Sequence, residues 1–460
     1  MGVRTGGKMH DALRTEGVKL QVGDIIDRIV SRANIEAATE EVVENRGAAG
    51  IDKMSVYEGR EYMRKHQDEI VEQIRNGTYM PQPVRRVYIP KPNGKKRGLG
   101  IPTVVDRVVQ QMISRVLIVE YDQYFSEYSY GFRPKRNAHM AMKQALKYLN
   151  EDGCEWVVDL DIEKYFDTVN HDKLISILRE HVNDAKLLHL IRSFLKAGVM
   201  EKGLVSETVE GVPQGGPLSC VLSNIYLDKF DKELEQRGLR FARYADDCNI
   251  FVKSELAANR VMQSVSVWLQ RKLFLKVNAE KSKVVRPTNS LFLGFTYWKS
   301  KDGWKLRPAS DRKKRLQDKI RVLTDTKLAR ATDLGHTFYI INQTVKGWIN
   351  YYSISSMKTF MENTGSWLRH RVRRVIITQW KKPRTIMKNL LILNRLGGLG
   401  FSTERIRQIA NTRLGKWRMT QLSGISRLIS EKFLETPNKS RHRPALVNPL
   451  EYITSRNQPE

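Results

Sequence analysis

Apolar and polar residues alternate along several short stretches in the first two thirds of the chain, and this pattern predicts β-strands. In residues 84–102, Val87 and Ile89 lead into Asn93-Gly94, the strongest short-range signal of a β-hairpin. Three further stretches are expected to contain strands: residues 155–174, where a turn and a helix follow the strand, residues 241–252, which form a second hairpin, and residues 291–298.

Apolar residues recur at helical spacing between these strands and throughout the last third of the chain. The first helix is predicted to begin at Asn34, as its N-cap, and to end before Gly47. Further helices are expected over residues 105–116, after the Gly/Pro-rich loop at 211–216, and over 256–272. From about residue 305, three basic helices carry apolar stripes: Leu316, Ile320 and Leu323; Ile341, Val345, Trp348 and Tyr352; and Leu368, Val372, Val375 and Ile376.

Length and charge narrow the class of protein. A chain of 460 residues is long enough for two or three domains. Its 79 Lys and Arg residues against 50 Asp and Glu give a formal net charge of +29, which indicates a polyanionic partner, with nucleic acid the leading candidate. No acidic residue occurs between Glu362 and Glu404, the segment that contains the third basic helix.

Cysteine usage and hydropathy exclude several other classes. The three cysteines form no CxxC motif and no cluster with histidine, so neither a disulfide scaffold nor a zinc module is expected. No apolar run approaches the roughly 18 residues that a membrane span requires. We therefore expect a cytoplasmic protein with no membrane partner.

Two acidic sites could carry chemistry. Asp246 and Asp247 are adjacent in the turn of the second hairpin, where like charges repel unless a cation lies near them. Such acids are more often simply solvated, because aspartate tolerates turn geometry. However, Asp159 and Asp161 occupy alternate positions of another predicted strand and so share one face of it. Two strands that each bring an acid to their end could hold two Mg²⁺ ions roughly 4 Å apart, the arrangement used for phosphoryl transfer.

Six motifs occur in an order that resembles the reverse transcriptases and maturases encoded by bacterial group II introns. In chain order they are "PVRRVYIPKPNGKKRGLGIPTVVDRVVQQ", "YGFRPKRNAHMA", "VVDLDIEKYFDTVNHDKL", "GVPQGGPLSCVLSNIYLD", "RYADD" and "FLGF". The similarity runs from about residue 30 to about residue 430. It implies an α+β right-hand polymerase fold with fingers and palm, followed by an α-helical thumb and a small helical nucleic-acid-binding segment.

The resemblance also implies a division of the chain into domains. An N-terminal arm would occupy residues 1–22, and the fingers and palm residues 23–304. The thumb, or maturase X domain, would follow over 305–385, the DNA- and RNA-binding D domain over 386–445, and a C-terminal tail over 446–460.

The resemblance assigns roles to individual residues. Asp161, Asp246 and Asp247 are the expected catalytic residues and ligands of two Mg²⁺ ions, whereas Asp159 has no catalytic counterpart in the family. Phe166 corresponds to a sugar gate that favours deoxynucleotides, although the pattern alone fits a core aromatic residue at the start of a helix. The implied dNTP-binding residues are Lys91, Arg97, Phe166, Gln214, Gly215 and Lys281. Implied primer and template contacts are Arg133, Tyr244, Ala245, Leu293 and Gly294, and implied RNA-binding residues are Arg369, Arg371, Arg373 and Arg374.

The expected activity is RNA-templated DNA synthesis during intron retrohoming, together with intron RNA binding that assists splicing. The expected partners are intron RNA, an RNA template with a DNA primer, target DNA and dNTPs, and the oligomeric state stays open. Nothing after residue 400 resembles a metal-dependent nuclease, so we expect no endonuclease. Two alternatives are an RNA-binding splicing factor with a vestigial polymerase, and a reverse transcriptase recruited to phage defence.

Overall fold

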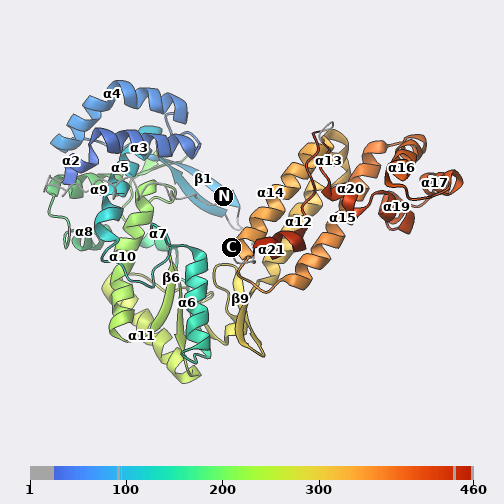
Figure 1. The fold of residues 1–460 in the computed structure, drawn as a ribbon. Helices are drawn as coiled ribbons and strands as arrows, with labels where there is room; N and C mark the ends of the chain where they lie inside the picture. Colours follow the sequence, from blue (N-terminus) through green and yellow to red (C-terminus); the bar gives the residue numbers. More distant parts are fainter. Residues whose placement is uncertain (1–24, 91–93, 95, 202, 439–441, 457–460) are drawn as a thin grey trace. The chain divides into compact units, whose positions relative to one another are not determined.

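The computed structural model describes residues 25–90, 94, 96–201, 203–438 and 442–456, and the chain divides into two compact units, residues 1–292 and 293–460 (Figure 1). The predicted N-terminal arm, Lys91 and Asn93 lie outside the described residues. Helices and small, mostly antiparallel sheets occur together, which confirms the predicted α+β class.

The first unit contains two four-stranded sheets. One has the strand order β2-β1-β4-β5 and the other β6-β7-β3-β8. The strands are β1 (Val84–Pro90), β2 (Lys96–Ile101), β3 (Trp156–Leu160), β4 (Val199–Glu201), β5 (Leu204–Ser206), β6 (Arg240–Tyr244), β7 (Asp247–Val252) and β8 (Lys283–Val285). β1 and β2 pair antiparallel, as do β6 and β7, so both predicted hairpins are confirmed.

Helices surround these sheets. They are α2 (Ile25–Ile29), α3 (Arg32–Glu44), α4 (Val56–Asn76), α5 (Val104–Tyr121), α6 (Ala138–Asn150), α7 (Tyr165–Thr168), α8 (His171–Leu178), α9 (Ala185–Lys196), α10 (Pro217–Gln236), α11 (Glu255–Leu273) and the 3-10 helix η1 (Pro287–Asn289). Of these, α6 and α11 pack against the sheet of β6, β7, β3 and β8. These helices therefore support the sheet in which β3 and β7 end.

The predicted N-cap of the first long helix is wrong. The cap of α3 is Ser31, and Asn34 lies inside the helix, where its amide donates to the carbonyl oxygens of Ile29 (2.9 Å) and Met112 (3.1 Å). Its side-chain oxygen accepts from Arg115 Nε (2.8 Å). A contact with α5 therefore determines the position of Asn34, and local capping does not.

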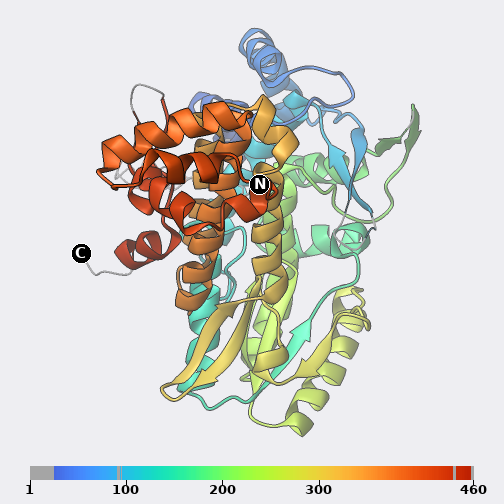
Figure 2. The same ribbon diagram turned by 90° about the vertical axis from the view of Figure 1, so that its right-hand side faces the viewer.

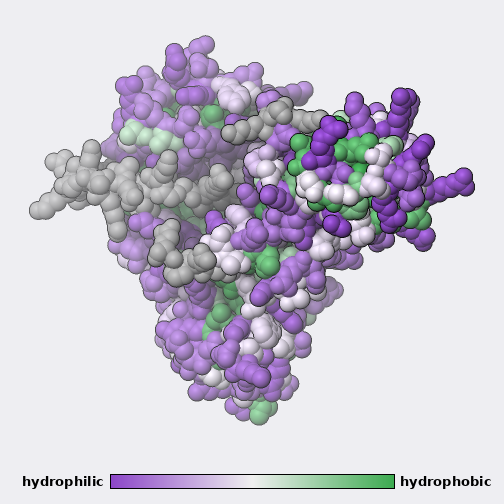
Figure 3. Space-filling model, turned by 45° about the vertical axis from the view of Figure 1, so that its right-hand side comes forward, coloured by the Kyte–Doolittle hydropathy of each residue, from purple (hydrophilic) through white to green (hydrophobic). Residues whose placement is uncertain are grey.

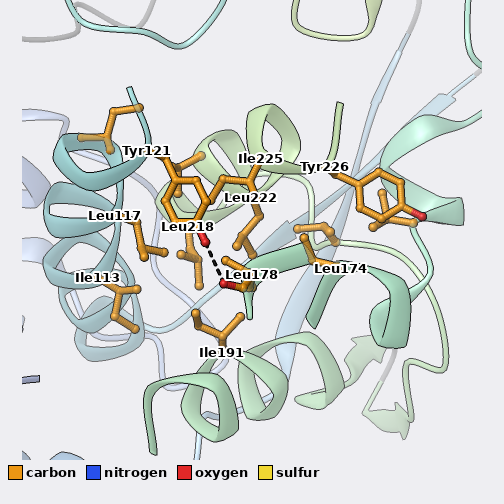
Figure 4. Close-up of a cluster of buried hydrophobic side chains, with 14 of the residues drawn as sticks. Ile113, Leu117, Tyr121, Leu174, Leu178, Ile191, Leu218, Leu222, Ile225 and Tyr226 are labelled. Atoms are coloured by element: carbon orange, nitrogen blue, oxygen red, sulfur yellow. Dashed lines mark hydrogen bonds between the residues drawn. The ribbon is translucent and has the colours of Figure 1, made fainter. Parts of the chain in front are cut away.

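Part of the core of the first unit lies where α5, α8, α9 and α10 meet (Figure 4). Tyr121 adds a hydrogen bond to the apolar packing, because its hydroxyl donates to the carbonyl oxygen of Leu178 (2.9 Å). The labelled residues are all buried: Ile113, Leu117 and Tyr121 of α5, Leu174 and Leu178 of α8, Ile191 of α9, and Leu218, Leu222, Ile225 and Tyr226 of α10.

The second unit begins with a two-stranded sheet and continues as helices, coloured orange to red from α14 onward (Figures 1 and 2). Its elements are β9 (Phe295–Ser300), β10 (Gly303–Pro308), α12 (Ser310–Leu323), α13 (Thr326–Ala331), α14 (Leu334–Tyr352), α15 (Lys358–Trp380), α16 (Pro383–Gly397), α17 (Thr403–Ala410), α18 (Lys416–Met419), α19 (Ser423–Leu428), α20 (Glu431–Glu435) and α21 (Pro449–Arg456). The three predicted apolar stripes fall on α12, α14 and α15. All their residues are buried except Leu323 and Trp348, which are half-buried.

Hydrophilic residues cover most of the surface that Figure 3 shows. Within the described residues, no helix combines the length and the apolar character that a membrane crossing requires.

Candidate active site

The two adjacent acids lie at a tight hairpin turn. Tyr244 pairs with Asp247 at the end of β6 and β7, which leaves Ala245 and Asp246 as the two residues of the turn. Ala245 has φ of +58°, the left-handed conformation that two-residue hairpin turns require. Tyr244 is half-buried and Ala245 is buried, so the turn is held by its surroundings.

The third acid meets this turn because of the strand register. β3 pairs antiparallel with β7, with Leu160 opposite Cys248. The next residue of β3, Asp161, therefore comes beside the residue that precedes Cys248, which is Asp247. The structure thus brings together the three acids that the motifs identify.

Two of the three acids have raised pKa values. Withdrawal from water raises the pKa of Asp246, and the charge of Asp161 adds to the rise. The same two causes, with the charge of Asp246 the larger electrostatic one, raise the pKa of Asp247 to about 6. The charge of Lys281 acts against this rise in the pKa of Asp247. The site has an excess of negative charge that a cation would relieve.

Lys281 supplies a cation in the structure. Its ammonium donates to both carboxylate oxygens of Asp161, at 3.0 Å each. The neighbouring Ser282 hydroxyl accepts from the backbone N–H of Asp161 (3.0 Å), so the segment before β8 holds this acid from two sides.

Carboxylate oxygens are the ligands that Mg²⁺ prefers, and the acids' repulsion makes the donor set suitable for a divalent ion. In the described part of the chain, however, no three Asp, Glu, His or Cys side chains are grouped closely enough to hold a metal. Asp161 instead forms an ion pair with Lys281. The three carboxylates are therefore chemically suitable ligands for a metal, but in this structure Asp161 is paired with a lysine.

Two predicted dNTP-binding residues contact each other. Arg97 of β2 donates from Nε to Oε1 of Gln214 (3.0 Å), and the charge of Arg97 acts against the pKa rise of Asp246. Gly100 donates its N–H to the carbonyl oxygen of Gln214 (2.9 Å). Gly215 has φ of +120°, and a Cβ there would lie 2.9 Å from the Gly100 carbonyl oxygen, so the loop needs glycine at this position.

Phe166 lies beside the same loop. It is half-buried in α7, its ring is edge-on to that of Tyr165 (centroids 5.2 Å apart), and its carbonyl oxygen accepts from the Val212 N–H (2.6 Å). Both interpretations of Phe166 stay open, because its ring packs against the core and is also partly accessible.

A buried arginine that the motifs did not single out holds the acidic turn in place. Arg243, only 1% exposed, pairs with the fully buried Asp231 of α10 through Nε (2.7 Å) and Nη2. Its Nη1 donates to the carbonyl oxygen of Ala245 (2.8 Å) and to Asn224 Oδ1 (3.2 Å). The position of this arginine directly before "YADD" was the available signal, but its partner lies 12 residues away in another element.

The remaining predicted primer and template residues lie in different places. Arg133 is buried, and its guanidinium donates to Asp122 Oδ1 (2.7 Å) and to the carbonyl oxygens of Ser126 (2.6 Å) and Asp122 (2.9 Å), so nucleic acid could be bound only by breaking these bonds. Leu293 and Gly294 belong to the second unit. There the carbonyl oxygen of Leu293 accepts from the Tyr351 hydroxyl (2.8 Å).

The four arginines of α15 bind protein groups. Arg371 donates to Thr324 Oγ1 (2.6 Å) and Arg374 to the Thr324 carbonyl oxygen (3.0 Å), while Arg373 donates to the Ile429 carbonyl oxygen (2.8 Å). Arg369 pairs with Glu431 (2.8 Å). Their RNA-binding role stays a prediction, and it would require part of these contacts to be exchanged.

Known families match both units of the chain. Residues 89–297 match the family described as "Reverse transcriptase (RNA-dependent DNA polymerase)", and residues 313–391 match "Group II intron, maturase-specific domain".

Individual relatives agree with these families. The chain is 34% identical to Protein YkfC of Escherichia coli over 48% of this chain and 68% of that protein. It is 30% identical to the group II intron-encoded protein LtrA of Lactococcus lactis over 63% of each chain. A solved structure described as a partial Cas6-RT-Cas1--Cas2 complex aligns over 55% of this chain and 43% of that one, with 25% identity and a TM-score of 0.35, too low to support an argument.

A reverse transcriptase with a maturase domain is the class that these matches define. The chain belongs to the family of group II intron-encoded reverse transcriptases with a maturase domain. It spans a little under two thirds of the length of LtrA.

Proposed function

We propose that this protein is an RNA-directed DNA polymerase that also binds intron RNA as a maturase. The observation that supports this most directly is the meeting of Asp161 with Asp246 and Asp247 at the ends of β3 and β7. The family normally uses divalent metal ions, and the proposal assigns two Mg²⁺ ions to these acids.

The chemistry would be attack of a primer 3′-hydroxyl on the α-phosphate of a dNTP. Bound Mg²⁺ would lower the pKa of that hydroxyl and stabilise charge on the leaving pyrophosphate. Asp161, Asp246 and Asp247 would hold the metal. Arg243 would keep the turn in position through its hydrogen bond to the Ala245 carbonyl oxygen. Lys281, which balances Asp161 in the structure, would neutralise phosphate charge.

The incoming nucleotide would lie near the contact between Arg97 and Gln214. Arg97 is exposed and would pair with the triphosphate, with Lys91 as a second cation. Gln214 and Gly215 would border the base, and Phe166 would exclude a 2′-hydroxyl. Tyr244 and Ala245 would border the primer end. Leu293 and Gly294 stay predicted primer contacts.

The second unit would bind the template–primer duplex and the intron RNA. Its α12 carries the exposed cations Lys314, Arg315 and Lys319, which suit the phosphate backbone. We also propose that the fingers and palm end at residue 304, the thumb at residue 385 and the D domain at residue 445. Target DNA is a further proposed partner.

The test is Mg²⁺-dependent primer extension on an RNA template with dNTPs, with Asp246→Asn/Asp247→Asn as the variant. Loss of metal ligands removes several kcal/mol of transition-state stabilisation, so extension should fall by about a thousandfold or more. Asp302→Asn, an exposed acid in the β9–β10 turn, is the matched control and should keep full activity.

Splicing of the cognate intron is measured on the same proteins. Retained splicing by the double variant would separate RNA binding from polymerisation. No extension by the wild-type protein, with splicing intact, would contradict the polymerase proposal and leave an RNA-binding splicing factor.

A further inference from the structure

A cavity of about 640 Å³ lies in the second unit, apart from the acidic turn in sequence and in composition. It is lined by Thr326 at the start of α13, Arg374 of α15, and the segment 413–418, which includes α18. Ligand sites in proteins commonly have volumes of about 300–1,000 Å³, so the cavity is large enough for one nucleotide.

Four cations line the cavity, and Asp325, which is next to Thr326 and interacts electrostatically with Arg374, is not among the lining residues. Arg374, Arg413, Lys416 and Arg418 line it, and none of the described lining residues is acidic. The sequence contains no Asp or Glu between Glu404 and Glu431. Burial, and then the charge of Arg330, lower the pKa of Lys416, as expected where cations crowd together without acids.

Arg374 also has an unused donor. Its Nη2 donates to the Thr324 carbonyl oxygen (3.0 Å), but its Nε is buried and has no hydrogen-bond partner among the described residues. A buried donor without an acceptor destabilises a protein by about 1–3 kcal/mol. Arg374 therefore lines the cavity with part of its hydrogen-bonding capacity not satisfied by the described residues.

Trp417 provides an aromatic surface at the same place. The residue is 37% exposed, and the ring of His370 contacts the Trp417 ring edge-on from one side (centroids 4.1 Å apart). Arg374 lies 5.5 Å from the ring centroid. An exposed aromatic ring held among cations is the arrangement on which unpaired bases stack.

We propose that this cavity binds one unpaired nucleotide of a single-stranded nucleic acid, with the base stacked on Trp417 and the flanking phosphates on Arg374, Arg413, Lys416 and Arg418. The site is separate from the polymerase chemistry, because binding there needs neither dNTPs nor a divalent metal. RNA and DNA single strands share the required chemistry, and the experiment distinguishes them.

The test measures fluorescence anisotropy of a labelled, unstructured RNA oligonucleotide with the full chain, without dNTPs and divalent cations. Trp417→Ala should weaken binding by about tenfold, as stacking contacts do, and Trp417→Phe should restore most of it. Arg413→Gln/Lys416→Gln should also weaken binding by about tenfold and lower the salt dependence by about 1.4 in the logarithmic slope. A DNA oligonucleotide of the same sequence and an RNA duplex are measured in parallel.

The matched control is Arg405→Gln/Arg407→Gln, which removes two exposed cations of α17 that do not line the cavity. Equal losses in the two double variants would show a diffuse charge effect and overturn the proposal. So would unchanged binding of the single strands by Trp417→Ala, or a loss of duplex binding in that variant as large as the loss of single-strand binding. Because the assay requires no polymerisation, it stands or fails independently of primer extension, and thermal unfolding of each variant confirms that it is folded.

Discussion

Two buried arginines, one in each unit, have different partners. In the first, Arg243 is 1% exposed and pairs with the fully buried carboxylate of Asp231. In the second, Arg371 is 8% exposed but donates to the Thr324 hydroxyl and the Arg321 carbonyl oxygen. Burial, followed by the charges of Arg374 and Arg321, lowers the pKa of Arg371 to about 10, and the charge of Asp325 acts in the opposite direction. The oxygens that accept from Arg371 among the described residues are neutral.

The difference explains how each unit becomes suited to a different partner. In the first unit, the charge of Asp231 neutralises the charge of Arg243. Arg243 therefore does not neutralise the carboxylates of the turn that it supports, and their negative charge is available to a metal ion. Where hydroxyl and carbonyl oxygens hold the arginines, the positive charge remains available to a polyanion. A buried arginine can therefore lie in a region of negative or of positive potential, depending on whether an acid or a neutral oxygen accepts its hydrogen bonds.

Replacing each arginine by alanine is the strongest way to test this comparison. Arg243→Ala leaves Asp231 charged and buried without a partner, so the free energy of unfolding of the first unit should fall by about 3–5 kcal/mol. Arg371→Ala leaves only neutral acceptors unpaired and should destabilise the second unit by about 1–3 kcal/mol. Urea unfolding followed by hydrogen exchange of peptides from each unit measures both values.

Adding Asp231→Asn to Arg243→Ala should recover part of the stability, because it removes the unpaired charge. Equal losses from the two arginine variants, or no recovery in the double variant, would contradict the distinction between cancelled and uncancelled arginines.

Asp228 gives a further test of the comparison between paired and unpaired charges. It lies one turn before Asp231 in α10, and it accepts a hydrogen bond from the Ser126 N–H, whereas Asp231 accepts from Arg243. Burial, and then the charge of Asp231, raise its pKa from 3.8 to about 6. As pH rises from about 4 to 6, the unfolded chain loses this proton before the folded protein does, so stability falls with pH. Asp228→Asn should therefore match the wild type near pH 4 and exceed it by about 1–2 kcal/mol above pH 6.

Thermal and urea unfolding across this pH range check the result. The amide oxygen of asparagine can still accept from the Ser126 N–H, which Asp228 binds at 3.2 Å. A difference that does not depend on pH would show that packing, and not ionisation, determines the effect.

The smallest expected effect concerns Lys281, whose ion pair with Asp161 is exposed. Such pairs contribute about 0.2–1 kcal/mol, so Lys281→Gln should leave stability nearly unchanged. Because the ammonium no longer competes for Asp161, the Mg²⁺ concentration that gives half-maximal stabilisation should fall by about 1.5- to 5-fold. Lys283→Gln, which removes the partner of Asp159 (3.8 Å), is the control and should not change it. An unchanged midpoint in Lys281→Gln would indicate that Mg²⁺ does not replace the lysine.

Sequence reasoning located most elements of the fold because their signals are local. Alternation and Asn-Gly identified the β1–β2 hairpin, and helical spacing identified α5, α10, α11 and the stripes of α12, α14 and α15. It also singled out Asp161, Asp246 and Asp247, through a resemblance that rests on six motifs in the family's order, and their catalytic role stays a prediction. Asn34 was wrongly assigned as a cap, because its partners Met112 and Arg115 are nearly eighty residues away.

What the sequence by itself determined is the set of periodic elements, the excess of positive charge and the identity of the acidic turn, since each follows from neighbouring residues. Tertiary structure alone decided which charges are cancelled. It paired Arg243 with Asp231 and Lys281 with Asp161, turned the α15 arginines toward protein oxygens, and brought Arg374 to the segment that contains Trp417. These outcomes depend on distances between elements far apart in the chain, and a desolvated charge is stable only where such a partner arrives.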